Sequence, residues 1–249
     1  MRALAMNYAQ LMNQASTYSL GPTALLHLRT AHDLAQRLVD GVYRKEGSPF
    51  ICHLIRTASI VMDEVEGKDT DAVAASMLHA VYFLHYFKGS RRRGPRKSDR
   101  EFLREQLGER AERLLDRYGK MPWNTVEALS DYASRASDVD DELRVLLLMQ
   151  LSDELEDHLD NAAAYAPKAK ANQHYQKFGP LYVELALKLG HERLADDLKR
   201  AFKACEEAEI HDCLLQTGHC SYELRNRLWT ANLVERLGAW LRRVRAKRN

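Results

Sequence analysis

Apolar side chains recur at intervals of three and four residues along most of the chain, the spacing of helices that bury one stripe. The clearest early example covers residues 23–38 and ends at Asp40-Gly41. Its buried stripe is formed by Leu25, Leu28, Ala31, Leu34, Ala35 and Leu38. The same spacing predicts a second helix that follows Pro49 and ends near Gly67, and a third from Asp69 to about Phe87.

The remainder of the chain continues in this way. We predict a helix over about 98–118, a long and strongly patterned helix from about 143 to 165, and a helical pair over 181–202 hinged at Gly190. Glycine (12) and proline (6) are scarce and long Val/Ile/Thr runs are absent, so the fold class is all-α. We divide the chain into an N-terminal lead-in (1–22), a helical domain (23–203) and a C-terminal helical appendage (204–249).

Composition excludes several classes of protein. Hydrophobic residues make up 45% and charged residues 29% of the 249 positions, as in ordinary globular proteins. A net charge of +2 is too small to imply a polyanionic partner for the whole molecule. No run of about 18 apolar residues is present to span a membrane. Four cysteines are too few for a disulfide framework, and residues 1–16 lack the apolar segment of a signal peptide. We therefore expect a cytoplasmic protein.

The most informative polar residues are carboxylates on an apolar stripe. Asp153 lies seven residues after Leu146, so it belongs to the buried side of its predicted helix, and Asp157 and Asp160 follow at four and seven. A buried carboxylate needs a metal, another cation or several donors as its partner. Three in a line therefore predict a positive group among them. Taken singly, a buried aspartate, or a histidine such as His79, is more often a hydrogen-bonded core residue than a ligand.

Five segments in a fixed order carry a resemblance to a known family. They are residues 43–53 (YRKEGSPFICH), 70–79 (TDAVAASMLH), 102–122, 148–157 (LMQLSDELED) and 178–190. Together they resemble the HD-domain superfamily, and most closely the hydrolase domain of Rel/SpoT-type guanosine polyphosphate synthetase-hydrolases. The resemblance implies an all-α, HD-domain-like helical bundle.

The resemblance also implies a metal site. His53, His79 and Asp153 occupy three of the family's four metal-ligand positions, whereas the fourth, an aspartate in the family, is Ala80 here. The family's Glu-Asp pair, which serves water activation, falls on Phe83-Leu84. We expect one divalent metal, Mn, Fe or Zn, at this incomplete site.

The same resemblance implies roles for the neighbouring residues. Arg44 and Lys45 match basic residues of the family's nucleotide pocket and are candidate substrate contacts, together with Asp160. Asp157, at the position of a family asparagine, is the candidate general base or a further substrate contact. Because Asp157 and Asp160 make the pocket more negative, we do not expect hydrolysis of guanosine polyphosphate itself.

Two classes of function remain open. The first is a metal-dependent small-molecule enzyme, phosphohydrolase-like by default, with Fe-type oxidation as a variant. The second is a catalytically inactive HD pseudoenzyme that binds a ligand or a protein. The basic loop 91–97 is either an anion-clamping lid or a solvated loop, and it lacks the interleaved aromatic residues that favour nucleic-acid binding. The apolar stripe of the C-terminal helix predicts docking on the domain or on a second copy of the chain.

Overall fold

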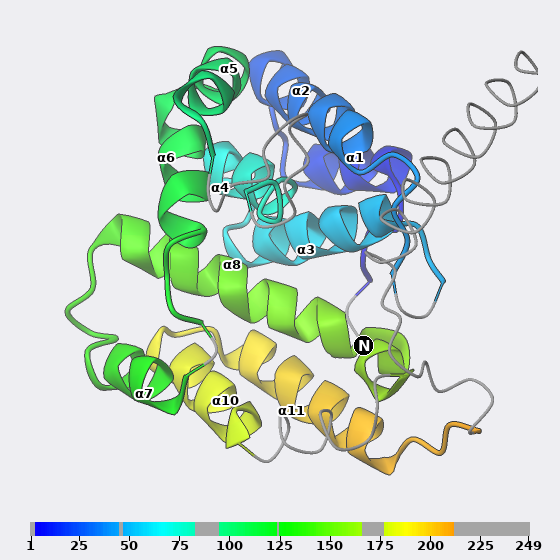
Figure 1. The fold of residues 1–249 in the computed structure, drawn as a ribbon, viewed down its shortest axis with the longest axis vertical. Coiled ribbons are helices and arrows are strands. Elements are labelled where there is room, and N and C mark those ends of the chain that lie inside the picture. Colours follow the sequence, from blue (N-terminus) through cyan, green and yellow to red (C-terminus); the bar gives the residue numbers. More distant parts are fainter. Residues whose placement is uncertain (1–2, 45–46, 83–94, 124, 166–176, 212–249) are drawn as a thin grey trace, which may run out of the picture.

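The structure is a computed structural model that describes residues 3–44, 47–82, 95–123, 125–165 and 177–211. The all-α prediction is confirmed, because every regular element in these ranges is a helix (Figure 1). The helices are α1 (Tyr8–Thr17), α2 (Pro22–Leu38), α3 (Phe50–Glu64), α4 (Thr70–Ser76), α5 (Lys97–Leu107), α6 (Glu109–Tyr118), α7 (Val126–Ser134), α8 (Asp141–His158), the 3₁₀ helix η1 (Leu159–Tyr165), α10 (Gly179–Lys188) and α11 (Glu192–Glu207). None of them combines the length and apolar composition that a membrane span requires.

Helix α8 is the central element. It packs against α3, α4 and α6 on one side and against α10 and α11 on the other, as Figure 1 shows. All seven residues from Leu146 to Ser152 are buried. A helix covered on several sides needs apolar or satisfied polar residues around its circumference rather than along one stripe. Polar groups on α8 therefore lie inside the molecule, where they require partners.

The first helix lies within the predicted N-terminal lead-in (1–22) and contributes to the core. Helix α1 packs against α2 and α3, and Leu11 and Ala15 on its inner face are fully buried. The side chain of Asn7 caps its N-terminus by accepting a hydrogen bond from the Gln10 amide at 3.0 Å. A capped helix with two fully buried apolar residues contributes to the stability of the whole bundle.

The predicted division at residues 203 and 204 falls inside α11, which continues to Glu207. Most of the predicted appendage, including its C-terminal helix, lies outside the described residues. The three-segment organisation and docking through the C-terminal helix therefore stay predictions.

The third predicted helix is shorter than the pattern indicated. Asp69 caps α4 by accepting a hydrogen bond from the Ala72 amide at 3.0 Å, but α4 ends at Ser76. Backbone hydrogen bonds between residues three apart replace the α-helical pattern after Ser76. They run from the Leu78 amide to the Ala75 carbonyl and from the Val81 amide to the Leu78 carbonyl. His79 consequently lies on a buried turn and not on a helix. The end of the predicted helix, residues 83–87, lies outside the described residues.

Candidate metal centre

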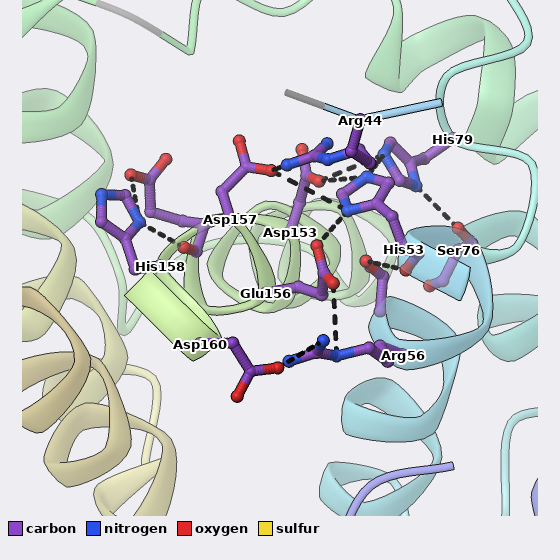
Figure 2. A network of polar contacts seen from close by, with 12 residues as sticks. Arg44, His53, Arg56, Ser76, His79, Asp153, Glu156, Asp157, His158 and Asp160 are labelled. Atoms are coloured by element: carbon purple, nitrogen blue, oxygen red, sulfur yellow. Dashed lines mark hydrogen bonds and ion pairs between the residues drawn. The ribbon is translucent and has the colours of Figure 1, made fainter. Parts of the chain in front are cut away.

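Three side chains that are distant in sequence converge at one point of the fold. His53 comes from the first turn of α3, His79 from the turn after α4, and Asp153 from the C-terminal half of α8 (Figure 2). The Nε2 atoms of the two imidazoles are 3.3 Å apart. Oδ1 of Asp153 lies 3.1 Å from Nε2 of His53 and 3.2 Å from Nε2 of His79. The three atoms form a nearly equilateral triangle.

The size of this triangle fits a transition-metal ion. Metal–nitrogen and metal–oxygen bonds of about 2.0–2.2 Å place neighbouring ligand atoms about 3.0 Å apart at right angles and about 3.4 Å apart at tetrahedral angles. The edges of 3.1, 3.2 and 3.3 Å lie within that interval. A metal held by these three groups would have coordination positions open for water or substrate.

Contacts behind the triangle determine which imidazole nitrogens face it. Nδ1 of His79 lies 2.7 Å from the carbonyl oxygen of Ser76, and Nδ1 of His53 contacts the carboxylate of Glu156. Carbonyl and carboxylate oxygens only accept hydrogen bonds, so each Nδ1 carries the proton. In neutral imidazoles both Nε2 lone pairs then point toward Asp153. Two lone pairs and a carboxylate oxygen at van der Waals distance repel one another unless a cation lies between them.

The pKa values of the site residues also indicate a positive charge among the three atoms of the triangle. Burial and the charge of Arg44 lower the pKa of His53, but Glu156 and Asp153 outweigh them and raise it to about 9. Burial opposes ionisation of Asp153, yet the two imidazoles hold the pKa of its carboxyl well below the usual range. Without a metal, a proton on His53 therefore supplies the positive charge at the triangle. A bound metal would displace that proton.

Asp153 is oriented by a tyrosine hydroxyl. The Tyr118 hydroxyl lies 3.2 Å from Oδ2 of Asp153 and 2.8 Å from Oε1 of Gln150, and it can donate to either oxygen. Burial and the charge of Asp153 raise the pKa of Tyr118 well above its ordinary value, so the hydroxyl stays protonated. The contact occupies Oδ2 and leaves Oδ1 directed at the imidazoles.

The other predicted site residues have partners of their own. Arg44 pairs with Asp157, whose side chain is 43% exposed, and Nη1 of Arg56 lies 2.9 Å from Oδ2 of Asp160. The prediction that three carboxylates share one helix face is wrong for Asp160. Helix α8 ends at His158, and Asp160 has a left-handed backbone (φ 54°). The positive groups beside Asp157 and Asp160 are arginines of the same chain. Lys45 lies outside the described residues.

The charged side chains around the triangle form a network whose net charge suits a divalent cation. Its four carboxylates are those of Asp153, Glu156, Asp157 and Asp160, and its two guanidinium groups are those of Arg44 and Arg56. With neutral imidazoles the network therefore carries two negative charges. His53, Glu156 and Asp157 form a second group close enough to share a metal. Since each of those carboxylates already pairs with an arginine of the chain, the triangle is the better site.

Three residues that support the triangle were not predicted from the sequence. Glu156, Arg56 and Tyr118 are absent from the predicted site, although all three contact its members or their partners. Glu156 follows Asp153 by three positions and Arg56 follows His53 by three, so helical spacing offered a signal for both. No comparable signal marks Tyr118, because it lies on α6 and reaches the site only through tertiary packing.

A family model described as "HD domain" matches residues 31–192, about two thirds of the chain. The chain belongs to the HD-domain family. The match encloses all three corners of the triangle, and HD domains bind divalent metals, so His53, His79 and Asp153 are candidate ligands on two independent grounds. A search of curated proteins finds no significant match.

The donor set of this HD domain narrows the choice of metal. Two imidazole nitrogens and one carboxylate oxygen suit Mn, Fe or Zn, whereas Mg and Ca prefer sites built from oxygen ligands. Ala80 follows His79 directly, and its methyl group is buried and offers no ligand atom. Among the residues that the structure describes, the site therefore offers three candidate protein ligands, where the family pattern has four.

Proposed function

We propose that this HD-domain protein is a metal-dependent small-molecule enzyme of phosphohydrolase-like type, with one divalent metal held by His53, His79 and Asp153. The observation that supports this most strongly is the triangle of two Nε2 atoms and one carboxylate oxygen with edges of 3.1–3.3 Å. Membership of the HD-domain family supports the same reading. When bound, the metal would supply a Lewis acid that also lowers the pKa of a coordinated water.

The residues at the rim of the site have distinct roles in this proposal. Asp157 is the candidate general base or substrate contact, because its half-exposed carboxylate lies one helical turn from Asp153. Arg44 is the candidate contact for an anionic group. Since Arg44 is paired with Asp157, a phosphate would compete with that carboxylate for the guanidinium. Displacement of Arg44 by a substrate would free Asp157 to accept a proton.

A phosphorylated metabolite is the proposed substrate class, and kinship with the Rel/SpoT-type hydrolases is part of the proposal. The pairs Arg44–Asp157 and Arg56–Asp160 reduce the repulsion that the carboxylates would exert on an anion. The absence of a carboxylate at Ala80 still distinguishes this site from the family pattern. We therefore propose a small phosphate ester rather than a guanosine polyphosphate as the substrate.

A noncatalytic HD protein is the second candidate, and the same Ala80 favours it. A site with one ligand fewer binds metal more weakly, and a chain that had lost catalysis would retain the helical scaffold. In that case the imidazoles and Asp153 would remain a proton-bridged core cluster.

Elemental analysis of protein purified without chelator tests the two candidates. We expect about one equivalent of Mn, Fe or Zn in the wild-type protein and its loss in His79→Ala. The matched control is His32→Ala, which removes an imidazole that stacks on Tyr8, outside the site. Iron would direct activity assays toward oxidation, and manganese or zinc toward hydrolysis of phosphate esters. Folded wild-type protein that stays metal-free after incubation with each ion would refute the enzyme proposal.

A further inference from the structure

Glu156 is the most deeply buried carboxylate in the candidate centre that is not itself a corner of the triangle. Its side chain is 7% exposed, and it lies on α8 one turn after Asp153. One carboxylate oxygen, Oε2, contacts Nδ1 of His53, and the other, Oε1, lies 3.3 Å from Nε of Arg56 (Figure 2). Both oxygens thus face groups of the chain itself, which leaves neither directed at a substrate.

From this geometry we infer that Glu156 is a positioning residue, which holds His53 as a metal ligand while Arg56 holds Glu156. The inference rests on the proposed metal function and adds to it two residues that the HD-domain match does not assign. The hydrogen bond from Nδ1 fixes the ring so that Nε2 faces His79 and Asp153. It also makes Nε2 a stronger donor, because a carboxylate that accepts the Nδ1 proton increases the basicity of the ring.

Asp157 cannot take over this role in the observed arrangement. Its nearest carboxylate oxygen lies 3.8 Å from Nδ1 of His53, beyond hydrogen-bond distance, and it is paired with Arg44. A buried carboxylate such as Glu156 is costly unless it is paired and hydrogen-bonded. Arg56 supplies the ion pair from α3, and His53 on the same helix supplies the hydrogen bond. The two helices are therefore connected by a chain of contacts that runs from Arg56 through Glu156 to His53.

The arrangement has a consequence for a site to which the described part of the chain offers three candidate ligands. With Ala80 in place of a fourth ligand, each remaining ligand contributes a larger share of the metal affinity. Loss of the carboxylate behind a metal-binding histidine typically costs about 10–100-fold in affinity. We expect Glu156→Ala to lie toward the upper end of that range.

The test compares zinc affinity, measured by competition with a chromophoric chelator, in three variants. Glu156→Ala should bind zinc about 10–100-fold more weakly than wild type. Glu156→Gln should lose less, because its amide oxygen still accepts the Nδ1 proton, and it guards against misfolding of the alanine variant. The control is Glu184→Ala, which removes a half-exposed carboxylate that pairs with Lys188 on α10, outside the network. It should bind zinc within about threefold of wild type.

A second readout does not depend on metal. In the ¹H–¹⁵N spectrum of metal-free protein, His53 should show a downfield, exchange-protected Nδ1 proton, assigned by its absence from His53→Ala. It should persist in Glu184→Ala and disappear in Glu156→Ala. Wild-type zinc affinity in Glu156→Ala, or survival of that proton in the variant, overturns the inference. A wild-type protein that binds no zinc overturns the proposed function instead. In that case, loss of the Nδ1 proton signal in Glu156→Ala still supports Glu156 as the residue that orients His53.

Discussion

Asp153→Asn is the substitution that tests the triangle most directly. Oδ1 of Asp153 lies 3.1 and 3.2 Å from the two Nε2 atoms, and Oδ2 lies 3.2 Å from the Tyr118 hydroxyl. Asparagine has nearly the same shape and keeps an oxygen that can accept from Tyr118. It removes the charge, so the network with neutral imidazoles carries one negative charge instead of two. The variant therefore changes metal binding with little change in packing.

The expected effect is a loss of thermal stabilisation by metal. At a free metal concentration 100 times Kd, binding to the native state stabilises it by about 2.7 kcal/mol. In a chain of this length each kcal/mol raises Tm by about 2–4 °C, so the wild-type Tm should rise by about 5–11 °C. If the substitution lowers affinity about 100-fold, the same concentration equals Kd. The stabilisation is then RT ln 2, about 0.4 kcal/mol, and Tm rises by only about 1–2 °C.

Differential scanning calorimetry with and without manganese, iron or zinc measures this difference. Asp131→Asn is the matched control, since it makes the same chemical change in an exposed carboxylate on α7 that pairs with Arg135, outside the network. Equal Tm increases in wild type and Asp153→Asn would show that the ion binds elsewhere and that the reasoning from the triangle is wrong.

Three further predictions concern the scaffold. Leu11→Ala should cost about 2–5 kcal/mol in urea unfolding, because the side chain is fully buried; a cost below about 1 kcal/mol would mean that α1 lies outside the cooperative core. Gly67→Ala should lower Tm by several degrees, since φ is +69° and a Cβ would lie 2.7 Å from Cβ of Tyr18; an unchanged Tm would contradict this packing. Burial raises the pKa of Asp69, but hydrogen bonds from Arg110 and from the α4 amides outweigh it and lower that pKa below its ordinary value. The resulting stabilisation is present above the unfolded-state pKa of about 3.9 and is lost as pH falls through the folded-state value. The stability difference between wild type and Asp69→Asn should therefore be constant from pH 7 to about pH 5 and shrink toward pH 3, as measured by urea unfolding; a difference that does not shrink would exclude the ion pair with Arg110 as its source.

Much of the architecture could be predicted because it depends on local periodicity. The apolar stripe of residues 23–38 corresponds closely to α2, and the position of Asp153 seven residues after Leu146 placed its carboxylate inside the molecule. Helix ends were harder to predict. The apolar spacing continues past Ser76, but α4 ends there. Backbone hydrogen bonds between residues three apart follow, and Nδ1 of His79 contacts the Ser76 carbonyl. Such competition between side chain and backbone leaves little trace in hydrophobic spacing.

The order of residues alone was enough to indicate an all-α chain and to single out His53, His79 and Asp153, because helical repeats and motif order are properties of the chain itself. Only the packed structure could show that these three groups meet within 3.3 Å, that Arg44 and Arg56 neutralise Asp157 and Asp160, and that Glu156 lies behind His53. Each of those facts depends on how α3, the turn after α4 and α8 sit against one another. That arrangement is set by burial of apolar surface over the whole bundle, so no single segment encodes it.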